Sequence, residues 1–83
     1  MEETRVAILG IIVENNNSAE EINALLHEYS SCIIGRFGIP YRERGISIIC
    51  IVMDAAQDAI NTLSGRIGKL KGVNCKVTYS NVK

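Results

Sequence analysis

The stretch Arg5-Val6-Ala7-Ile8-Leu9-Gly10-Ile11-Ile12-Val13 decides the fold, and Ile46-Ser47-Ile48-Ile49-Cys50-Ile51-Val52-Met53 repeats its character. Both stretches are short, almost wholly apolar and rich in β-branched residues, and polar or turn-forming residues bound them. Both alternating sets of side chains are apolar, which indicates strands buried on both faces. A helical pattern follows each stretch, so the chain is a doubled strand-helix-strand unit.

Two amphipathic helices are predicted, one after each apolar stretch. Ser18-Ala19-Glu20-Glu21 matches a capping box, in which the Ser18 hydroxyl accepts the backbone N–H of Glu21. Apolar residues at helical spacing then predict a helix from Ala19 to Ser31. Asp54 is the expected N-cap of the second helix. The apolar stripe of that helix recurs at steps of three and four residues: Ala56, Ile60, Leu63, Ile67 and Leu70.

A second strand is predicted from Cys32 to Tyr41. Pro40 places it at an edge of the sheet, because proline has no N–H to donate to a ladder. The polar run from Arg42 to Gly45 suits a hairpin connection, and Val73 to Ser80 alternates like a half-exposed edge strand. Alternation along the second strand gives two faces: Ile33, Gly35, Phe37, Ile39 and Tyr41 on one, and Ile34, Arg36 and Gly38 on the other.

The element order is therefore β-α-β-β-α-β in a single domain covering residues 1–83. Right-handed crossovers place the two apolar strands at the centre of a sheet. The expected fold class is α+β, ferredoxin-like, with a four-stranded antiparallel sheet and two helices on one face. Since the central strands are apolar on both faces, a monomer would expose a large apolar patch. We therefore expect a homodimer or a higher homo-oligomer that pairs through the open sheet face.

Composition excludes several classes of partner. The formal charge is zero at pH 7, so no direct binding to nucleic acid and no membrane association are expected. The longest apolar runs are too short to cross a bilayer. Glu2 and Glu3 stand where a secretory signal would carry basic residues. A cytoplasmic location is the expectation.

The chain has few candidates for metal or redox chemistry. Cys32, Cys50 and Cys75 are an odd, widely spaced set with no C-x-x-C pair. Free cysteine usually packs as a small hydrophobe, so packing is the favoured interpretation and a redox or metal role the alternative. His27 falls on a polar helix face, where solvation is favoured over ligation. No metal, no cofactor and no catalytic residue are predicted, and we expect the protein not to be an enzyme.

Gly35-Arg36-Phe37-Gly38 is the first candidate ligand-binding segment. Glycines inside a strand often mark a bulge or the close approach of a ligand or another backbone. Alternation places Arg36 on the face expected in the oligomer. There its guanidinium could bind an anion or a carboxylate, or it could form an ion pair between subunits.

Asn15-Asn16-Asn17 is the second candidate, in the loop between the first strand and the first helix. Exposed N–H groups at such a position can hold a small anion. The alternative is a turn that requires residues tolerant of the left-handed conformation.

The run Gly35-Arg36-Phe37-Gly38-Ile39-Pro40-Tyr41-Arg42-Glu43-Arg44-Gly45, with its flanking strand Ile46-Ser47-Ile48-Ile49 and the upstream Arg5 to Glu14, resembles a known family. This is the TM-1266-like group of iron-only hydrogenase system regulators, small bacterial proteins. The likeness covers nearly the whole chain. It implies a ferredoxin-like fold similar to ACT domains and to the C-terminal domain of nickel-responsive repressors, and a regulatory role linked to [FeFe]-hydrogenase and its maturation.

Two departures limit what the resemblance implies. Nickel-responsive repressors add a ribbon-helix-helix DNA-binding segment, whereas this sequence starts close to its first strand, and their metal site uses several histidines where this chain has His27 alone. By analogy with ACT domains, a small effector at a subunit interface would lie near Asn15 to Asn17 and Arg36. The leading hypothesis is an oligomeric regulator that senses a small ligand. The alternative is a ligand-free interaction module that docks on a hydrogenase maturation or transcription component.

Overall fold

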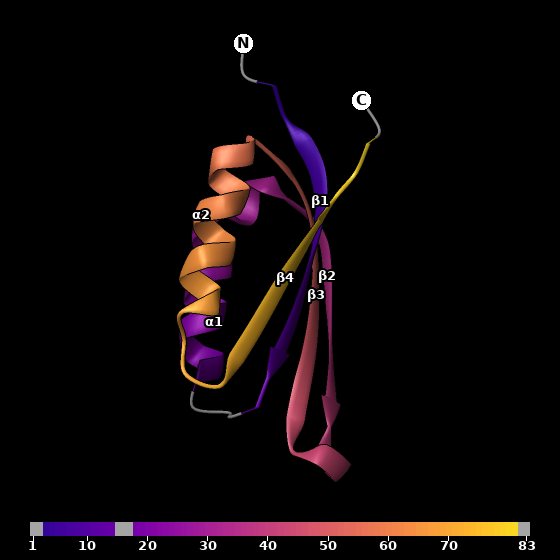
Figure 1. Cartoon of the computed structure of the whole chain (residues 1–83), viewed down its shortest axis with the longest axis vertical. Helices are drawn as coiled ribbons and strands as arrows, with labels where there is room; N and C mark the ends of the chain where they lie inside the picture. Colours follow the sequence, from indigo (N-terminus) through magenta and orange to yellow (C-terminus); the bar gives the residue numbers. More distant parts are fainter. Residues whose placement is uncertain (1–2, 15–17, 82–83) are drawn as a thin grey trace.

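A computed structural model of the chain describes residues 3–14 and 18–81. Its helices and strands follow the predicted order (Figure 1). Two short 3-10 turns, Ser30–Cys32 and Arg42–Arg44, flank the second strand. The elements are β1 (Arg5–Val13), α1 (Ala19–Glu28), β2 (Ile33–Tyr41), β3 (Ile46–Ala55), α2 (Gln57–Gly68) and β4 (Val73–Tyr79).

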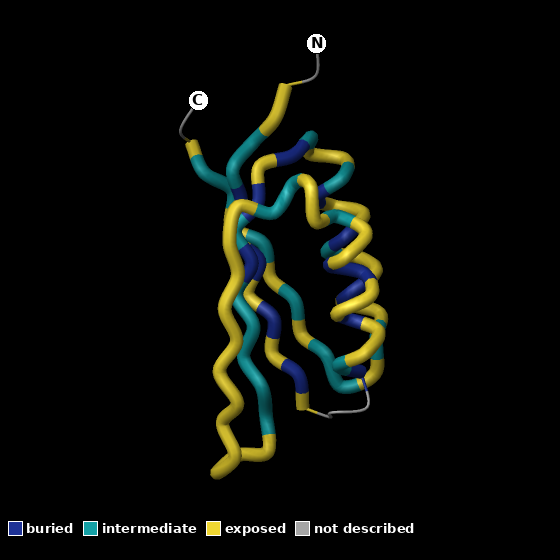
Figure 2. Tube along the Cα trace, turned by 180° about the vertical axis from the view of Figure 1, so that it is seen from behind, coloured by how far each residue is buried: buried dark blue, intermediate teal, exposed yellow. Residues whose placement is uncertain are grey.

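The four strands form one antiparallel sheet in the order β2-β3-β1-β4. The two apolar strands, β1 and β3, are therefore central, and β2 and β4 are the edges. Both helices cover the same face of the sheet (Figures 1 and 2). The predicted ferredoxin-like α+β fold is confirmed. No helix in the described part of the chain is long and apolar enough to span a membrane.

The core lies between the two helices and the covered face of the sheet. Alternate residues of the central strands point into it, and the apolar stripes of α1 and α2 meet them from the other side. Fully burying a large aliphatic side chain contributes about 1.5–3 kcal/mol, so this layer dominates the stability of so small a domain. The largest fully buried side chains are Leu9, Ile11, Ile22, Leu26, Ile51, Met53, Ile60, Leu63 and Ile67.

Three predicted details of the helix ends are wrong. Ser18 makes no capping hydrogen bond to α1; its hydroxyl instead donates to the main-chain oxygen of Lys71 at 2.9 Å. Asp54 is not an N-cap, because β3 continues to Ala55 and pairs there with the start of β1, which makes Ala56 the residue before α2. Helix α1 ends at Glu28, earlier than predicted, and a 3-10 turn follows it.

The hairpin formed by β2 and β3 extends past the ends of both helices (Figures 1 and 2). Its connection turns at Gly45, whose φ of 65° lies in the left-handed region that favours glycine. The hairpin residues are exposed on β2 and half-buried on β3, and the buried residues of β3 begin at Ile51. At this end of the sheet β1 still pairs with β3 as far as Ser47, so the turn and the Tyr41–Ile46 pair are the parts that extend beyond β1.

Candidate ligand pocket and open sheet face

The face of the sheet opposite the helices is largely apolar, and we call it the open face. Its most exposed members on the central strand β1 are Ile8, at 45%, and Ile12, at 40%. On the edge strand β2, Phe37 is 56% exposed. The polar side chains on this face come from β4, opposite β1, and from Asp54, which pairs with Val6 near the end of β3. The open face consists of Val6, Ile8, Gly10, Ile12, Phe37, Ile39, Tyr41, Ile46, Ile48, Cys50 and Val52, which share one side by strand register.

Arg36 does not lie on the open face, so its predicted orientation is wrong. The reason is a β-bulge: Ile33 pairs with Met53 and Gly35 with the next residue of β3, which leaves Ile34 as an extra residue. Strict alternation from Ile33 would put Gly35 on the same face as Ile33. Because of the extra residue, Gly35 and every later residue of β2 lie on the face opposite to the one that alternation predicts. Arg36 pairs with Ile51, whose side chain is in the core, and it points toward the helices. The predicted grouping of Ile33 with Phe37 fails for the same reason.

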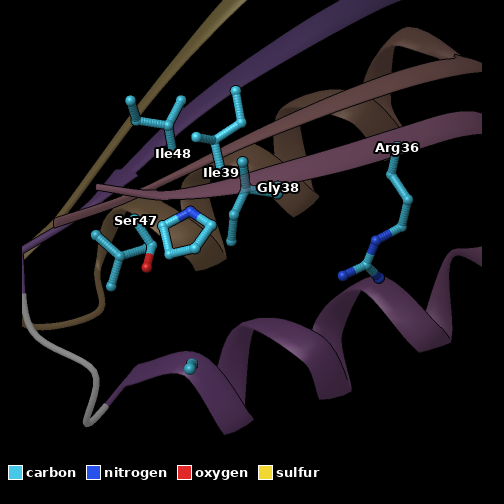
Figure 3. A pocket seen from close by; sticks show the side chains of 9 residues that line it. Arg36, Gly38, Ile39, Ser47 and Ile48 are labelled. Atoms are coloured by element: carbon cyan, nitrogen blue, oxygen red, sulfur yellow. The ribbon is translucent and has the colours of Figure 1, made fainter. Parts of the chain in front are cut away.

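A small pocket lies between the hairpin and the start of α1, and we call it the hairpin pocket (Figure 3). Its volume is about 240 Å³. The side chain of Arg36 reaches toward α1, whereas those of Ile39 and Ile48 point away from that helix. The lining residues are Val13, Ala19, Arg36, Gly38, Ile39, Pro40, Ser47, Ile48 and Ile49.

Arg36 is held at one end of this pocket by helix α1. Its Nη2 donates a hydrogen bond of 3.1 Å to Oδ1 of Asn23. Beyond that bond lies a second hollow of about 300 Å³, lined by Asn23, His27 and Ser30 among others. Within residues 3–14 and 18–81, the only ion pair joins Arg66 to Glu28, so no carboxylate there neutralises Arg36.

The structure brings together only part of the predicted site. Arg36 and Gly38 line the hairpin pocket, whereas Gly35 pairs with Val52 and faces the opposite side. Asn15, Asn16 and Asn17 lie outside the described residues. Sequence reasoning missed Asn23 and Ser47. Ser47 is polar within an almost wholly apolar strand, which was a usable signal, but Asn23 resembles any solvated helix residue.

The cysteines and His27 form no chemical cluster. The three thiols are free and half-buried, and burial raises the pKa of the Cys75 thiol. His27 is exposed on α1. Across the described residues, no group of three or more histidine, cysteine, aspartate or glutamate side chains could hold a metal ion.

The fold, the open face and the hairpin pocket define a class: a ferredoxin-like domain whose notable features are an exposed apolar sheet face and a small pocket lined by one cation. The chain belongs to the TM1266-like family, described as "Iron-only hydrogenase system regulator, putative", which it matches over residues 5–77. The resemblance inferred from the sequence is thereby confirmed, and with it the description as a regulator.

One solved structure supports the same assignment, and a second supports the fold. The uncharacterized protein TM1266 from Thermotoga maritima is 37% identical, with a TM-score of 0.89 over 93% of this chain and 98% of that one. A formyltetrahydrofolate deformylase from Pseudomonas putida KT2440 is 16% identical, with a TM-score of 0.68 over 94% of this chain and 30% of its own. The second likeness concerns the fold alone. No curated protein matches the chain.

Proposed function

We propose that this protein is a regulator of the iron-only hydrogenase system that works as a homodimer and responds to a small ligand. The dimer forms by pairing the open faces of two copies. The ligand lies on the other side of the β2–β3 hairpin, in the hairpin pocket. The family description supports the regulatory role, and the exposed apolar face and the hairpin pocket support the dimer and the ligand.

The observation that carries the proposal is the open face. The four strands have seven to ten residues. With a spacing of about 4.8 Å between strands and a rise of about 3.3 Å per residue, the sheet spans roughly 20 by 30 Å. This flat area of roughly 600 Å² grows when the protruding side chains are included, and it approaches the ~800 Å² that each partner buries in a stable interface. A second copy is the natural occupant, since two such sheets pack face to face as in a sandwich.

The hairpin connects this face to the pocket. Ile39 and Ile48 pair with each other across β2 and β3, and their side chains belong to the open face. The same two residues also border the hairpin pocket. A ligand that orders the hairpin from the helix side therefore changes the surface that the second copy contacts. A ligand that binds one arrangement of the hairpin better than another therefore couples its own binding to dimer assembly.

Sedimentation equilibrium of the purified protein tests the dimer. We expect the wild type to have the mass of a dimer at micromolar concentration, and Ile8→Glu to be a folded monomer because a buried unpaired carboxylate is costly. Thr62→Glu is the matched control, since Thr62 is exposed on α2, away from the open face. A monomeric wild type would overturn the dimer and leave the open face for a different protein partner. A dimeric Ile8→Glu would place the interface elsewhere.

A further inference from the structure

We infer that the hairpin pocket binds a small monocarboxylate with a short aliphatic tail, its carboxylate on Arg36 and its tail over Gly38. The inference rests on the proposed regulatory function and names the chemical class of its ligand. Every residue that it uses lies within one copy of the chain.

The charge of the pocket selects an anion. A guanidinium carries five N–H donors in a rigid fork that matches a carboxylate. One of these donors is used by Asn23, and that bond fixes the orientation of the group relative to α1. No carboxylate of the described residues lies within ion-pair distance of Arg36. Arg36 is therefore an oriented cation at the end of the pocket, with donors left for a ligand.

The remaining walls select the rest of the ligand. Among the lining residues that the structure describes, Ser47 has the only polar side chain apart from Arg36; the others are aliphatic residues, Pro40 and Gly38. Phosphate sites generally combine several cations or a set of backbone N–H groups, and the described lining offers one cation. A singly charged head and an apolar body fit this arrangement better than a phosphate does.

The volume limits the size of the ligand. Pockets for drug-sized molecules measure about 300–1,000 Å³, and the hairpin pocket is smaller, at about 240 Å³. Gly38 contributes to this space because it has no side chain on the helix side of β2. A Cβ added there would meet the main-chain oxygen of Ile48 at 3.8 Å and Cγ1 of Ile49 at 4.0 Å. These are ordinary contacts, so a larger residue fits the strand but occupies the pocket.

Titration of ¹⁵N-labelled protein with 4-methylpentanoate tests the inference by NMR. We expect shifts of the Gly38 and Ile49 amides and of the Arg36 Nε–H. The neutral analogue 4-methylpentanamide and inorganic phosphate should bind at least about tenfold more weakly, because each loses either the charged pair or the apolar contact. If the amide bound as tightly as the carboxylate, the charge of Arg36 would not select the ligand. If phosphate bound more tightly, the ligand would be a phosphate and not a carboxylate.

Two substitutions locate the site, each with a matched control. Arg36→Gln removes the charge, and Gly38→Val fills the space; both should weaken binding at least about tenfold. Arg42→Gln removes an equivalent charge at the hairpin tip, and Gly35→Val adds the same side chain to the opposite face; both should bind as the wild type does. Unchanged binding by Gly38→Val, or no binding by the wild type at millimolar concentration, overturns the inference.

The monomeric variant separates this inference from the proposed dimer. Because the pocket lies within one copy, Ile8→Glu should still bind 4-methylpentanoate. If the wild type binds 4-methylpentanoate but sediments as a monomer, the ligand class stands and the dimer is wrong. If the wild type is a dimer but binds none of the three probes, the dimer stands and the proposed ligand class is wrong.

Discussion

Ser18 Oγ donates a hydrogen bond of 2.9 Å to the main-chain oxygen of Lys71, joining the residue before α1 to the segment between α2 and β4. Ser18 is 4% exposed and is the only buried polar residue in the part of the chain that the structure describes. The adjacent bond from Glu14 N to the oxygen of Gly72, at 2.7 Å, reinforces the same junction. These contacts fasten the end of β1 and the start of α1 to the second half of the fold.

Ser18→Ala should therefore destabilise the protein without changing its fold. Losing one partially buried hydrogen bond costs about 1 kcal/mol of unfolding free energy. Urea denaturation followed by circular dichroism measures this difference. Ser30→Ala is the control, because Ser30 is exposed, and it should shift the unfolding free energy by less than about 0.5 kcal/mol. Equal effects of the two substitutions would contradict a special role for Ser18.

The sequence predicts the architecture well because the determining signal is local and strong. Two apolar strands with two apolar faces can only be central, and Pro40 can only lie at an edge. The misplaced details all depend on partners distant in sequence. Ser18 has the spacing of a capping box, but its hydroxyl binds Lys71, 53 residues away. Asp54 lies in a strand because β1 is long enough to pair with it.

The site was harder to predict for a geometric reason. Alternation counts residues along a strand, and one extra residue reverses the facing of all that follow. The bulge at Ile34 therefore moves Arg36 from the open face to the helix side and moves Phe37 to the open face. Gly35 marks a possible bulge in the sequence, but a glycine does not identify which residue is extra. The pocket walls come from segments that only the folded chain brings together.

Deleting Ile34 should be tolerated. Ile33 and Gly35 already pair with consecutive residues of β3, so the deletion converts the bulge into a regular ladder and keeps both registers. Ile34 is also 63% exposed, so little burial is lost. Thermal unfolding by circular dichroism should be cooperative, and the Gly38 amide should still respond to ligand.

Deleting Phe37 is the matched control, because it should reverse the facing of Gly38 and of the residues toward the hairpin tip. We expect that variant to unfold at a clearly lower temperature than the Ile34 deletion. If the Ile34 deletion proved the more damaging of the two, the assignment of Ile34 as the extra residue would be wrong.

Stability should decline at alkaline pH through Cys75. Burial raises the pKa of this thiol, so the folded state holds the proton at a pH where the unfolded state releases it. Its contribution is therefore complete below the unfolded pKa of about 8.5 and is lost as the pH rises above that value. Urea denaturation from neutral to alkaline pH measures the unfolding free energy of the wild type and of Cys75→Ala. The unfolding free energy should decline more steeply with pH in the wild type. Parallel curves would contradict this assignment.

The reactivity of Cys50 provides an independent test of the proposed dimer. Cys50 is half-buried on the open face, between Gly10 and Phe37 of the neighbouring strands. In a protein whose other thiols are replaced, by Cys32→Ser and Cys75→Ala, alkylation by iodoacetamide should slow as the protein concentration rises, because mass action covers the thiol in the dimer. The Ile8→Glu background should abolish this concentration dependence while leaving the intrinsic reactivity of the thiol unchanged. Sedimentation gives the concentration range over which the protein associates. If the alkylation rate of Cys50 in the Cys32→Ser, Cys75→Ala protein did not change across that range, the two copies would meet through another surface.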